Sequence, residues 1–214
     1  MIMSFPEGPS EIIPIFPLNI VLFPQSSLPL HIFEERYKTL IHECITYDNP
    51  FGINLIHEQS IRSIGCTAVV QEVTKRYDDG RMDIIVEGRR RYSLLNLVEA
   101  PHPYYSGRIA WHNDVPEETD DELRYQAVNL YNEFVSRVFT GMVKKIDKDD
   151  IRRSRSFFLV QKSGLELLQR QMFLGMNSEN QRLELLIRHF ESMLPLLASQ
   201  MKVAELAKND GYIQ

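Results

Sequence analysis

Two histidine–glutamate pairs are the closest approach in this sequence to a metal-hydrolase motif. Zinc hydrolases place two histidines one helical turn apart with a glutamate beside the first, because both rings must reach the same ion. His42-Glu43 and His57-Glu58 supply the first half of that pattern, but neither is followed by a histidine four positions later. The sequence also has no glycine-rich loop followed by Lys and a hydroxyl residue, as phosphate binding requires. We therefore expect neither a metal site nor a nucleotide or other cofactor.

The serines and histidines form no recognisable nucleophile motif either. The Gly-x-Ser-x-Gly elbow of α/β-hydrolases is missing, since Gly8-Pro9-Ser10 continues with Glu11-Ile12. A dispersed Ser-His-Asp triad stays open, because triads are defined by geometry. His31 has the chemistry to act as an acid or base near neutral pH, but a structural or surface histidine before a helix is the interpretation we favour. No catalytic residue is assigned, and a small-molecule hydrolase is the least favoured alternative.

One basic cluster bears on nucleic-acid binding. Its members are Lys144, Lys145, Lys148, Arg152, Arg153 and Arg155. Three aspartates interleave with it, no aromatic residues alternate with it, and the net charge of the chain is -5. Phosphate-backbone affinity depends on clustered positive charge, so RNA is kept as an alternative and nucleic acid is disfavoured as a partner. The run Arg89–Arg91 ends a predicted strand, whose side chains alternate between faces, so pairing with Glu87 or Asp83 is expected instead of one basic patch.

The elements that position these residues differ between the two halves of the chain. The first half predicts strands at 51–56, 67–77, 81–87, 91–98 and 104–111, and Asp78-Asp79-Gly80 predicts a hairpin turn. Five or more strands with short turns favour a closed or half-closed β structure, because closure removes unpaired edges. One helix should lie across the sheet. Its expected apolar face comprises Phe33, Tyr37, Leu40, Ile41, Cys44 and Ile45.

The second half predicts helices, and an acidic run near 115–121 separates it from the first. Three capping boxes mark expected helix starts: Thr119 with Glu122, Ser163 with Glu166, and Ser178 with Gln181. Gly175 fits a helix end, and Pro195 should kink or end the last helix. We therefore predict a β-rich subdomain over residues 1–116, a helical subdomain over 117–208 and a C-terminal tail over 209–214.

Composition, cysteine content and the apolar segments indicate which class of protein this is and where in the cell we expect it. Composition is close to that of ordinary globular proteins, with 43% hydrophobic and 25% charged residues. The two cysteines, Cys44 and Cys66, lie far apart in apolar-leaning segments and are predicted to be buried, reduced thiols. The start of the chain lacks the pattern of a secretory signal, and the most apolar stretch, 12–24, is too short and too interrupted by proline to span a bilayer. A cytoplasmic location without a membrane partner is the expectation.

Three segments together resemble the substrate-binding domain at the N-terminus of Lon-type ATP-dependent proteases. The first is Ile13-Pro14-Ile15-Phe16-Pro17-Leu18 with Val21-Leu22-Phe23-Pro24 and Leu28-Pro29-Leu30. The second is Ile32-Phe33-Glu34-Glu35-Arg36-Tyr37, followed by Phe51-Gly52-Ile53, which is similar to stand-alone bacterial members. The third runs from Ile64-Gly65-Cys66-Thr67-Ala68 through Asp79-Gly80-Arg81 to a Glu-Gly-x-x-Arg corner at Glu87–Tyr92. Their order and spacing carry the resemblance, which covers 13–98; the helical remainder matches in kind.

The resemblance implies an α+β fold: a β-rich PUA-like pseudo-barrel with one crossing helix, followed by an α-helical bundle. It also implies a non-catalytic module that binds exposed apolar segments of other proteins and works with a separate ATPase or protease, because this sequence has no counterpart of the family's ATPase and protease domains. The LON domain of cereblon is related, but its added zinc module requires four thiolates and this chain has two cysteines.

The candidate peptide-binding residues lie in the second segment: Leu30, His31, Phe33, Glu34, Arg36 and Tyr37. Phe33, Glu34, Arg36 and Tyr37 either lock the crossover to the sheet or face outward at a groove, and we favour locking. A ligand here would be an extended or unfolded peptide held by apolar contacts and one charged pair. RNA binding through the PUA-like barrel is the alternative function, on fold analogy alone.

Overall fold

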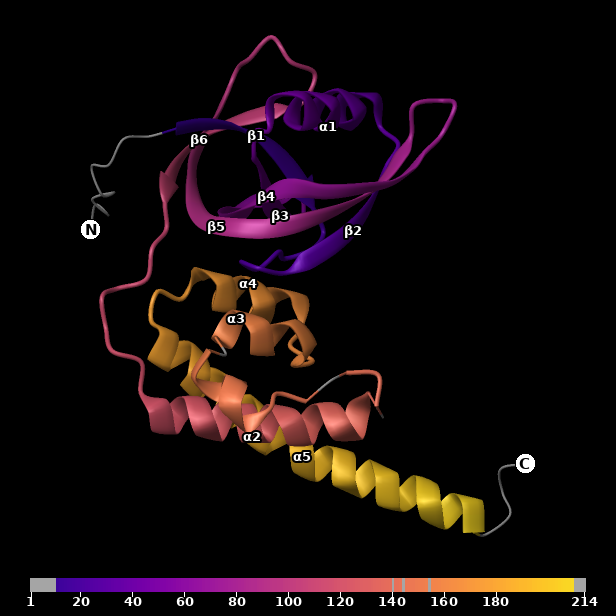
Figure 1. Ribbon diagram of the computed structural model, residues 1–214, viewed down its shortest axis with the longest axis vertical. Coiled ribbons are helices and arrows are strands. Elements are labelled where there is room, and N and C mark those ends of the chain that lie inside the picture. Colours follow the sequence, from indigo (N-terminus) through magenta and orange to yellow (C-terminus); the bar gives the residue numbers. More distant parts are fainter. Residues whose placement is uncertain (1–10, 140, 144, 154, 210–214) are drawn as a thin grey trace. The chain divides into compact units, whose positions relative to one another are not determined.

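The computed structural model describes residues 11–139, 141–143, 145–153 and 155–209. Contacts between residues divide the chain into two units (Figure 1). The first unit comprises the chain up to Val115 together with Glu166–Asn177, and the second comprises Pro116–Leu165 and the residues from Ser178 onward. The first is built on a β-sheet and the second is helical, which confirms the predicted α+β class. The predicted subdomain boundaries stay a prediction, although the contacts place a short helical segment of the second half with the sheet.

The first unit is a six-stranded sheet that closes on itself. The strands are β1 (Glu11–Leu18), β2 (Ser27–Ile32), β3 (Phe51–His57), β4 (Ser60–Arg76), β5 (Met82–Val98) and β6 (Tyr105–Trp111). Their order is β2-β5-β4-β3-β1-β6, and β6 also pairs with β5. Closure depends on the length of β5: its first part pairs with β2 through Met82–Glu87, while its second part pairs with β6 from Tyr92 to Val98. The expected closed β structure is present, but 81–87 and 91–98 are one strand, not two.

Turn chemistry and bulges allow this sheet to curl. The β4–β5 hairpin turns at the predicted Asp78-Asp79-Gly80, where Gly80 has a φ of +80° that L side chains rarely adopt. The register between β4 and β5 shifts at three places, each a bulge or irregularity. Bulges increase local twist and bend a strand, so they let two long strands wrap around a closed structure.

Glycines make room for a buried tyrosine where three strands meet. The Tyr92 hydroxyl donates to Asn54 Oδ1, and the Asn54 amide donates to the Arg62 carbonyl at 2.9 Å. A Cβ on Gly52 or Gly65 would lie 2.1 or 2.7 Å from Tyr92 atoms, closer than real contacts allow. Burial raises the pKa of Tyr92 well above its usual value, so the hydroxyl stays a donor.

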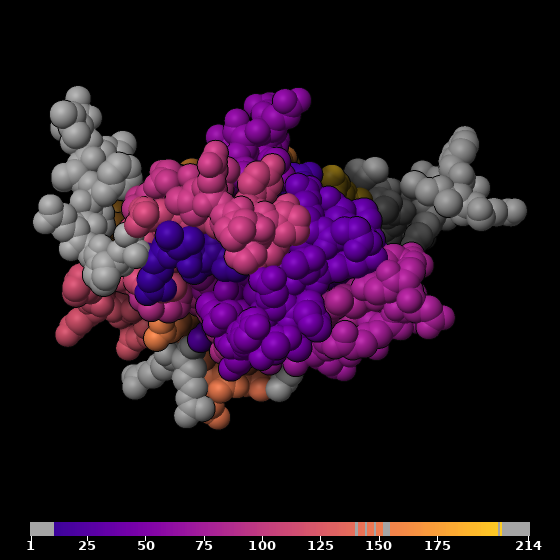
Figure 2. Space-filling model, turned by 90° about the horizontal axis from the view of Figure 1, so that it is seen from above, coloured from indigo at the N-terminus to yellow at the C-terminus, as the bar shows by residue number. Residues whose placement is uncertain are grey.

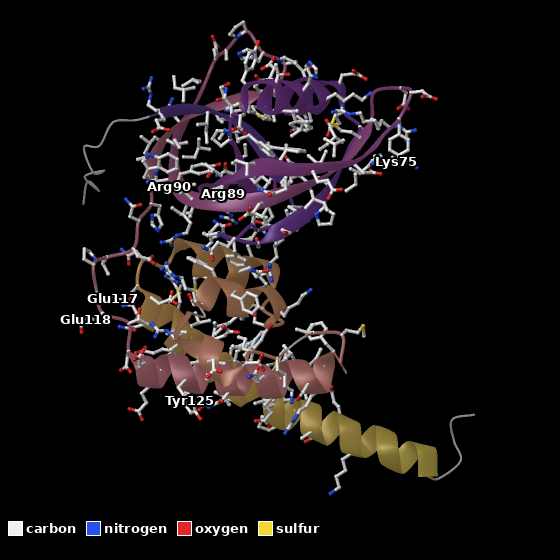
Figure 3. The ribbon with its side chains drawn as sticks, viewed as in Figure 1. Lys75, Arg89, Arg90, Glu117, Glu118 and Tyr125 are labelled. Atoms are coloured by element: carbon white, nitrogen blue, oxygen red, sulfur yellow. The ribbon has the colours of Figure 1, made fainter. Side chains whose placement is uncertain are left out.

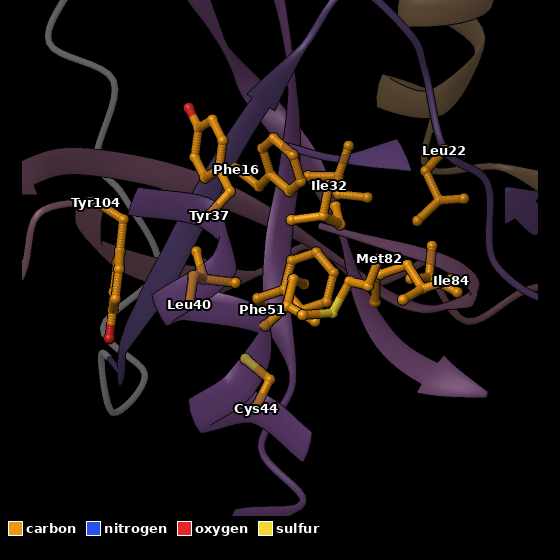
Figure 4. Close-up of a cluster of buried hydrophobic side chains, with 14 of the residues drawn as sticks. Phe16, Leu22, Ile32, Tyr37, Leu40, Cys44, Phe51, Met82, Ile84 and Tyr104 are labelled. Carbon is orange, nitrogen blue, oxygen red and sulfur yellow. The ribbon is translucent and has the colours of Figure 1, made fainter. Parts of the chain in front are cut away.

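Helix α1 (Glu35–Tyr47) covers the main apolar cluster of the sheet (Figure 4). Tyr37, Leu40, Ile41 and Cys44 are buried at helical spacing against side chains from β1, β3, β4 and β5. Two members of the expected apolar face differ, because Phe33 precedes the helix and is 60% exposed, and Ile45 is 38% exposed. Figure 2 shows α1 and the β5–β6 connection side by side on one face of the unit.

The second unit is a set of helices around an aromatic core. Its elements are α2 (Asp121–Val138), η1 (Lys148–Arg153), α3 (Ser156–Leu159), η2 (Val160–Lys162) and α5 (Glu179–Asn209). Phe190 of α5 lies between two α2 rings, with centroids 5.2 Å from Phe134 and 6.2 Å from Tyr131. Arg182 is buried, and its charge is met by Glu179 at 2.7 Å and by the Ser156 hydroxyl at 2.9 Å. This pairing allows a guanidinium to sit inside the unit.

Two of the three predicted capping boxes are wrong, because the helices begin at other residues. Asp120, not Thr119, caps α2, because its carboxylate accepts from the backbone amide of Glu122 at 2.8 Å. Helix α4 (Leu167–Gly175), which belongs to the first unit, begins after Glu166 instead of Ser163. The hydroxyl of Ser178 caps α5 as predicted, accepting from the amide of Gln181 at 3.1 Å.

Two further expectations concern helix ends and membrane spans. Gly175 is the last residue of α4, as predicted. Helix α5 continues past Pro195, so of the two predicted effects the helix end is wrong and the kink stays a prediction. Proline removes one backbone donor from a helix, but a long helix can continue past that loss. Among the described residues, none of the helices combines the length and apolar character needed to cross a membrane.

Candidate protein-binding surface

The predicted segment Leu30–Tyr37 divides between core and surface. Tyr37 is buried and stacks on Phe16 with ring centroids 3.9 Å apart. The Arg36 guanidinium lies 4.5 Å from the centre of the Tyr37 ring and pairs with Glu34 at 2.8 Å. Burial raises the pKa of Tyr37. In this geometry the charged pair covers an aromatic stack, which is compatible with the favoured locking role of Glu34, Arg36 and Tyr37; that role stays a prediction.

The remaining members of the predicted segment lie along β2 and just beyond it. Leu30 is partly buried against the main apolar cluster, while Phe33 is 60% exposed. His31 is exposed, with Nδ1 2.5 Å from Asp83 Oδ1 and its ring edge-on to Tyr77 at 5.8 Å. The hydrogen bonds from His31 and Tyr77 lower the pKa of Asp83. The structure thus brings His31 and Phe33 to one surface; peptide binding there stays a prediction.

A second candidate surface arises where helix α4 packs on the sheet. Arg91 of β5 donates to the carbonyl oxygens of Leu174 and Met176, at 2.8 and 2.5 Å, and pairs with Asp114. Its side chain is only 4% exposed. A cation at a helix C-terminus satisfies carbonyls that lack helical partners and complements the helix dipole. His112 adds a contact to the Gly175 carbonyl at 3.0 Å, so the end of α4 is fixed from the sheet side.

A groove of about 510 Å³ lies between β4 and α4. Arg62 and Ile64 of β4 line one side, and the opposite side consists of Leu168, Gln171, Met172, Gly175 and Met176. Leu168 and Met172 are 48% and 55% exposed although both are large and apolar. Their spacing of four residues places them on one face of α4. This face forms an apolar rim within the first unit.

Two residues that line the groove carry a buried polar atom with no hydrogen-bond partner in the described part of the chain. Among the described residues, neither Arg62 Nε nor Gln171 Oε1 makes a hydrogen bond, although both atoms are inaccessible to solvent. The other amide atom of Gln171, Nε2, donates to the Ile64 carbonyl at 2.9 Å, so the orientation of the amide is fixed. A buried polar group without a partner costs about 1–3 kcal/mol, and such groups are rare in folded proteins. Two residues that line the groove therefore carry one buried donor and one buried acceptor that lack a partner among the described residues.

Comparison with known proteins decides the family. Residues 12–192 match the family model described as the ATP-dependent protease La (LON) substrate-binding domain. The chain belongs to this LON domain family. The match extends into the second unit as far as residue 192, beyond the segment 13–98 on which the sequence motifs depended.

The LON domain resembles both curated proteases and solved structures. The Lon protease of Parabacteroides distasonis is 32% identical over 132 residues, which is 56% of this chain and 16% of that protein. The Lon protease of Roseiflexus castenholzii is 27% identical over 117 residues, 51% of this chain and 14% of that protein. The matching regions thus span about a sixth or less of these relatives.

Solved structures agree on the fold. A Lon N-terminal domain protein from Xanthomonas campestris superposes with a TM-score of 0.65 at 22% identity, covering 83% of this chain and 98% of that one. The N-terminal domain of a Mycobacterium avium complex Lon protease gives 0.64 at 19% identity, covering 85% and 98%. At these identities the likeness establishes the fold alone.

The Glu-Gly-x-x-Arg corner of this LON domain has a structural explanation. Gly88 exchanges backbone hydrogen bonds with the preceding loop, donating to the Ser26 carbonyl at 2.9 Å and accepting from the Gln25 amide at 2.7 Å. A Cβ on Gly88 would lie 2.1 Å from the Phe23 carbonyl oxygen, so only glycine permits this approach. Three residues later, Arg91 holds α4. The corner therefore fixes one wall of the groove.

The three neighbouring arginines have different partners and do not form one basic patch, although their burial does not follow strict strand alternation (Figure 3 labels Arg89 and Arg90). Arg89 is exposed and pairs with Glu87 at 3.2 Å, while Arg91 is buried. Arg90 is exposed and lies 3.8 Å from the Trp111 ring centre. The expected pairing of one arginine with Glu87 is confirmed; Asp83 instead pairs with His31.

The groove residues were not among the candidates that the sequence suggested. Arg62 and Gln171 lie 109 positions apart, and neither belongs to a motif. One usable signal existed on α4, where Leu168 and Met172 repeat at helical spacing on a face other than that of the buried Phe173 and Leu174. A second apolar face on a short helix indicates either another layer of core or a binding surface.

Three observations on the described residues bear on the alternative functions, a hydrolase and an RNA-binding protein. No group of three or more potential metal ligands occurs among the described residues. The Ser163 hydroxyl donates to the Val160 carbonyl at 2.9 Å, and the nearby His189 ring contacts the Ser163 carbonyl instead of that hydroxyl. Of the basic cluster, Lys144 lies outside the described residues, while Lys145 and Arg155 are exposed.

Proposed function

We propose that this LON domain is a binding module that holds exposed apolar segments of other protein chains and does no chemistry itself. The observation that carries the proposal is the match of residues 12–192 to a domain described as substrate-binding in an ATP-dependent protease. Protein substrates of a protease share an accessible backbone and exposed apolar side chains, which a folded, well-packed chain withholds. Handing the bound chain to a separate ATPase or protease, in the cytoplasm, is part of the same proposal.

The chemistry of the first unit supports a ligand of this kind. The groove combines apolar rim residues with a buried donor and acceptor, and the Leu30–Tyr37 segment adds exposed Phe33 close to His31. Apolar contacts with a few fixed polar groups are typical of peptide recognition. The groove is the favoured place, because its polar atoms have no protein partner among the described residues. The predicted segment is a second place for the same ligand.

The test compares an unfolded protein with its folded form. Fluorescently labelled α-lactalbumin, reduced and carboxymethylated so that it stays unfolded, is titrated with the intact chain and followed by fluorescence anisotropy. Native α-lactalbumin serves as the matched control. We expect saturable binding of the unfolded form only, with a dissociation constant of about 1–100 µM, as is usual for a small interface. Equal binding of both forms, or no saturable binding of either, contradicts the proposal.

A further inference from the structure

We propose that the β4–α4 groove recognises the backbone of an extended, apolar peptide segment through one peptide group. In this arrangement Arg62 Nε–H donates to a peptide carbonyl oxygen, and Gln171 Oε1 accepts from a peptide N–H. The inference rests on the proposed function and adds to it the position of the site and the chemical group recognised. The observation behind it is the juxtaposition of an unpartnered buried donor and an unpartnered buried acceptor in one groove.

The complementarity of this pair selects the ligand class. A carboxylate or phosphate offers acceptors only and would leave Gln171 Oε1 without a partner, while an ammonium group offers donors only and would leave Arg62 Nε without one. A peptide backbone carries both a donor and an acceptor at every residue other than proline. An extended backbone therefore satisfies both atoms, and it does so whatever the side chains are.

The rim of the groove sets a preference for apolar side chains next to that backbone. Leu168 and Met172 are about half exposed, and Ile64 and Met176 are partly buried. Methionine is unbranched and polarisable, so it adapts to side chains of different shape. A site built this way tolerates many sequences but requires an accessible backbone beside apolar side chains, which is the character of a locally unfolded protein.

In this arrangement the peptide is recognised by side chains and not by the edge of β4. Ile64 is the first residue of β4 that pairs with β5, opposite Ser93, and Ile61 and Gly65 are paired with β3 on the other side. The Ile64 carbonyl also accepts from the Gln171 amide, so a side chain already occupies the strand beside the groove. Arg62 Nε and Gln171 Oε1 are inaccessible to solvent, so a rim side chain must turn aside before a peptide can reach them. The rest of the site is preorganised, because the Gln171 amide is held by the Ile64 carbonyl and α4 is fixed by Arg91.

The first arm of the test removes each polar atom while keeping side-chain bulk. Arg62→Met and Gln171→Leu are titrated against the carboxymethylated α-lactalbumin described above, with Arg76→Met, on an exposed part of the same strand, as the matched control. Each groove variant should weaken binding about tenfold, the loss expected for one buried hydrogen bond, and the control should bind like the unchanged chain.

The second arm changes the ligand, so its outcome does not depend on the folding of a variant. A short capped apolar peptide is compared with versions that are N-methylated at one position each. Methylation at the residue that faces Gln171 should weaken binding to the unchanged chain about tenfold, and should cause no further loss in Gln171→Leu, because the two changes remove the same hydrogen bond.

The outcomes separate the two proposals. If the unchanged chain binds unfolded protein but the groove variants and the N-methylated peptides bind equally well, the groove is wrong and the protein-binding function stands. If the unchanged chain binds no unfolded protein, both are wrong. Tenfold losses confined to the groove variants and to one methylated position support the groove.

Discussion

Replacing Arg91 with methionine should uncouple helix α4 from the sheet. The change removes two hydrogen bonds to the Leu174 and Met176 carbonyls and one ion pair with Asp114, while keeping most of the side-chain volume. A charged hydrogen bond contributes about 1.5–3 kcal/mol, and the two carbonyl oxygens left behind lose such a donor, whereas the Asp114 side chain is 37% exposed and can be solvated. Since these contributions overlap, we expect the free energy of unfolding to fall by about 3–5 kcal/mol.

The measurement is urea unfolding followed by circular dichroism, with Arg89→Met as the matched control. Arg89 lies two residues away on the same strand, is half exposed and makes one ion pair, with Glu87. Exposed pairs contribute about 0–1 kcal/mol, so the control should unfold within that range of the unchanged chain. If Arg91→Met is no less stable than Arg89→Met, the explanation of the Glu-Gly-x-x-Arg corner is wrong.

Three further predictions concern the tyrosine site, the thiols and the helical unit. Gly65→Ala pushes a methyl group to 2.7 Å from Tyr92 and should cost about 1–3 kcal/mol, seen as a drop in melting temperature of about 2–4 °C per kcal/mol; an unchanged melting temperature would refute the close packing. Burial raises the pKa of Cys66 to about 12, so the thiol should resist iodoacetamide at pH 8 until urea unfolds the chain, and rapid labelling of the folded chain would contradict this. Hydrogen bonds, above all the one from the backbone amide of Asn180, lower the pKa of Glu117. Glu117→Gln should therefore be less stable than the unchanged chain above the ordinary glutamate pKa, and this difference should vanish as the pH falls through the lowered pKa. A stability difference that does not depend on pH would contradict this prediction.

The sequence predicted those parts of the fold that depend on local chemistry. Asp78-Asp79-Gly80 predicted its hairpin because a glycine with positive φ is a local requirement, and the buried face of α1 followed from helical spacing. Strand continuity was harder to predict. The sequence pattern is interrupted near Gly88, which is why β5 was predicted as two strands. At Gly88 the backbone of Phe23 approaches β5 closely, so the interruption reflects tertiary packing and not the end of a strand.

The candidate site was less predictable, for a physical reason. Arg62 and Gln171 become a pair only after β4 and α4 pack together, and no local pattern encodes a contact across 109 positions. Tyr37 shows the reverse case: the motif that contains it is recognisable, but its ring stacks on Phe16 in the core. Recognisable motifs in this chain therefore identify residues that build the fold more readily than residues that are available to a ligand.

Site-specific photocrosslinking tests the central claim most directly. Benzoylphenylalanine is placed singly at Met172 in the groove, at Phe33 in the predicted segment and at Tyr125 on the second unit, all of which are exposed in the structure (Figure 3 labels Tyr125). Each chain is irradiated with carboxymethylated or native α-lactalbumin. We predict a crosslink to the unfolded protein from position 172 and none from position 125. Strong crosslinks from position 125 would contradict the account. So would the absence of crosslinks from both 172 and 33 under conditions where the unfolded protein binds.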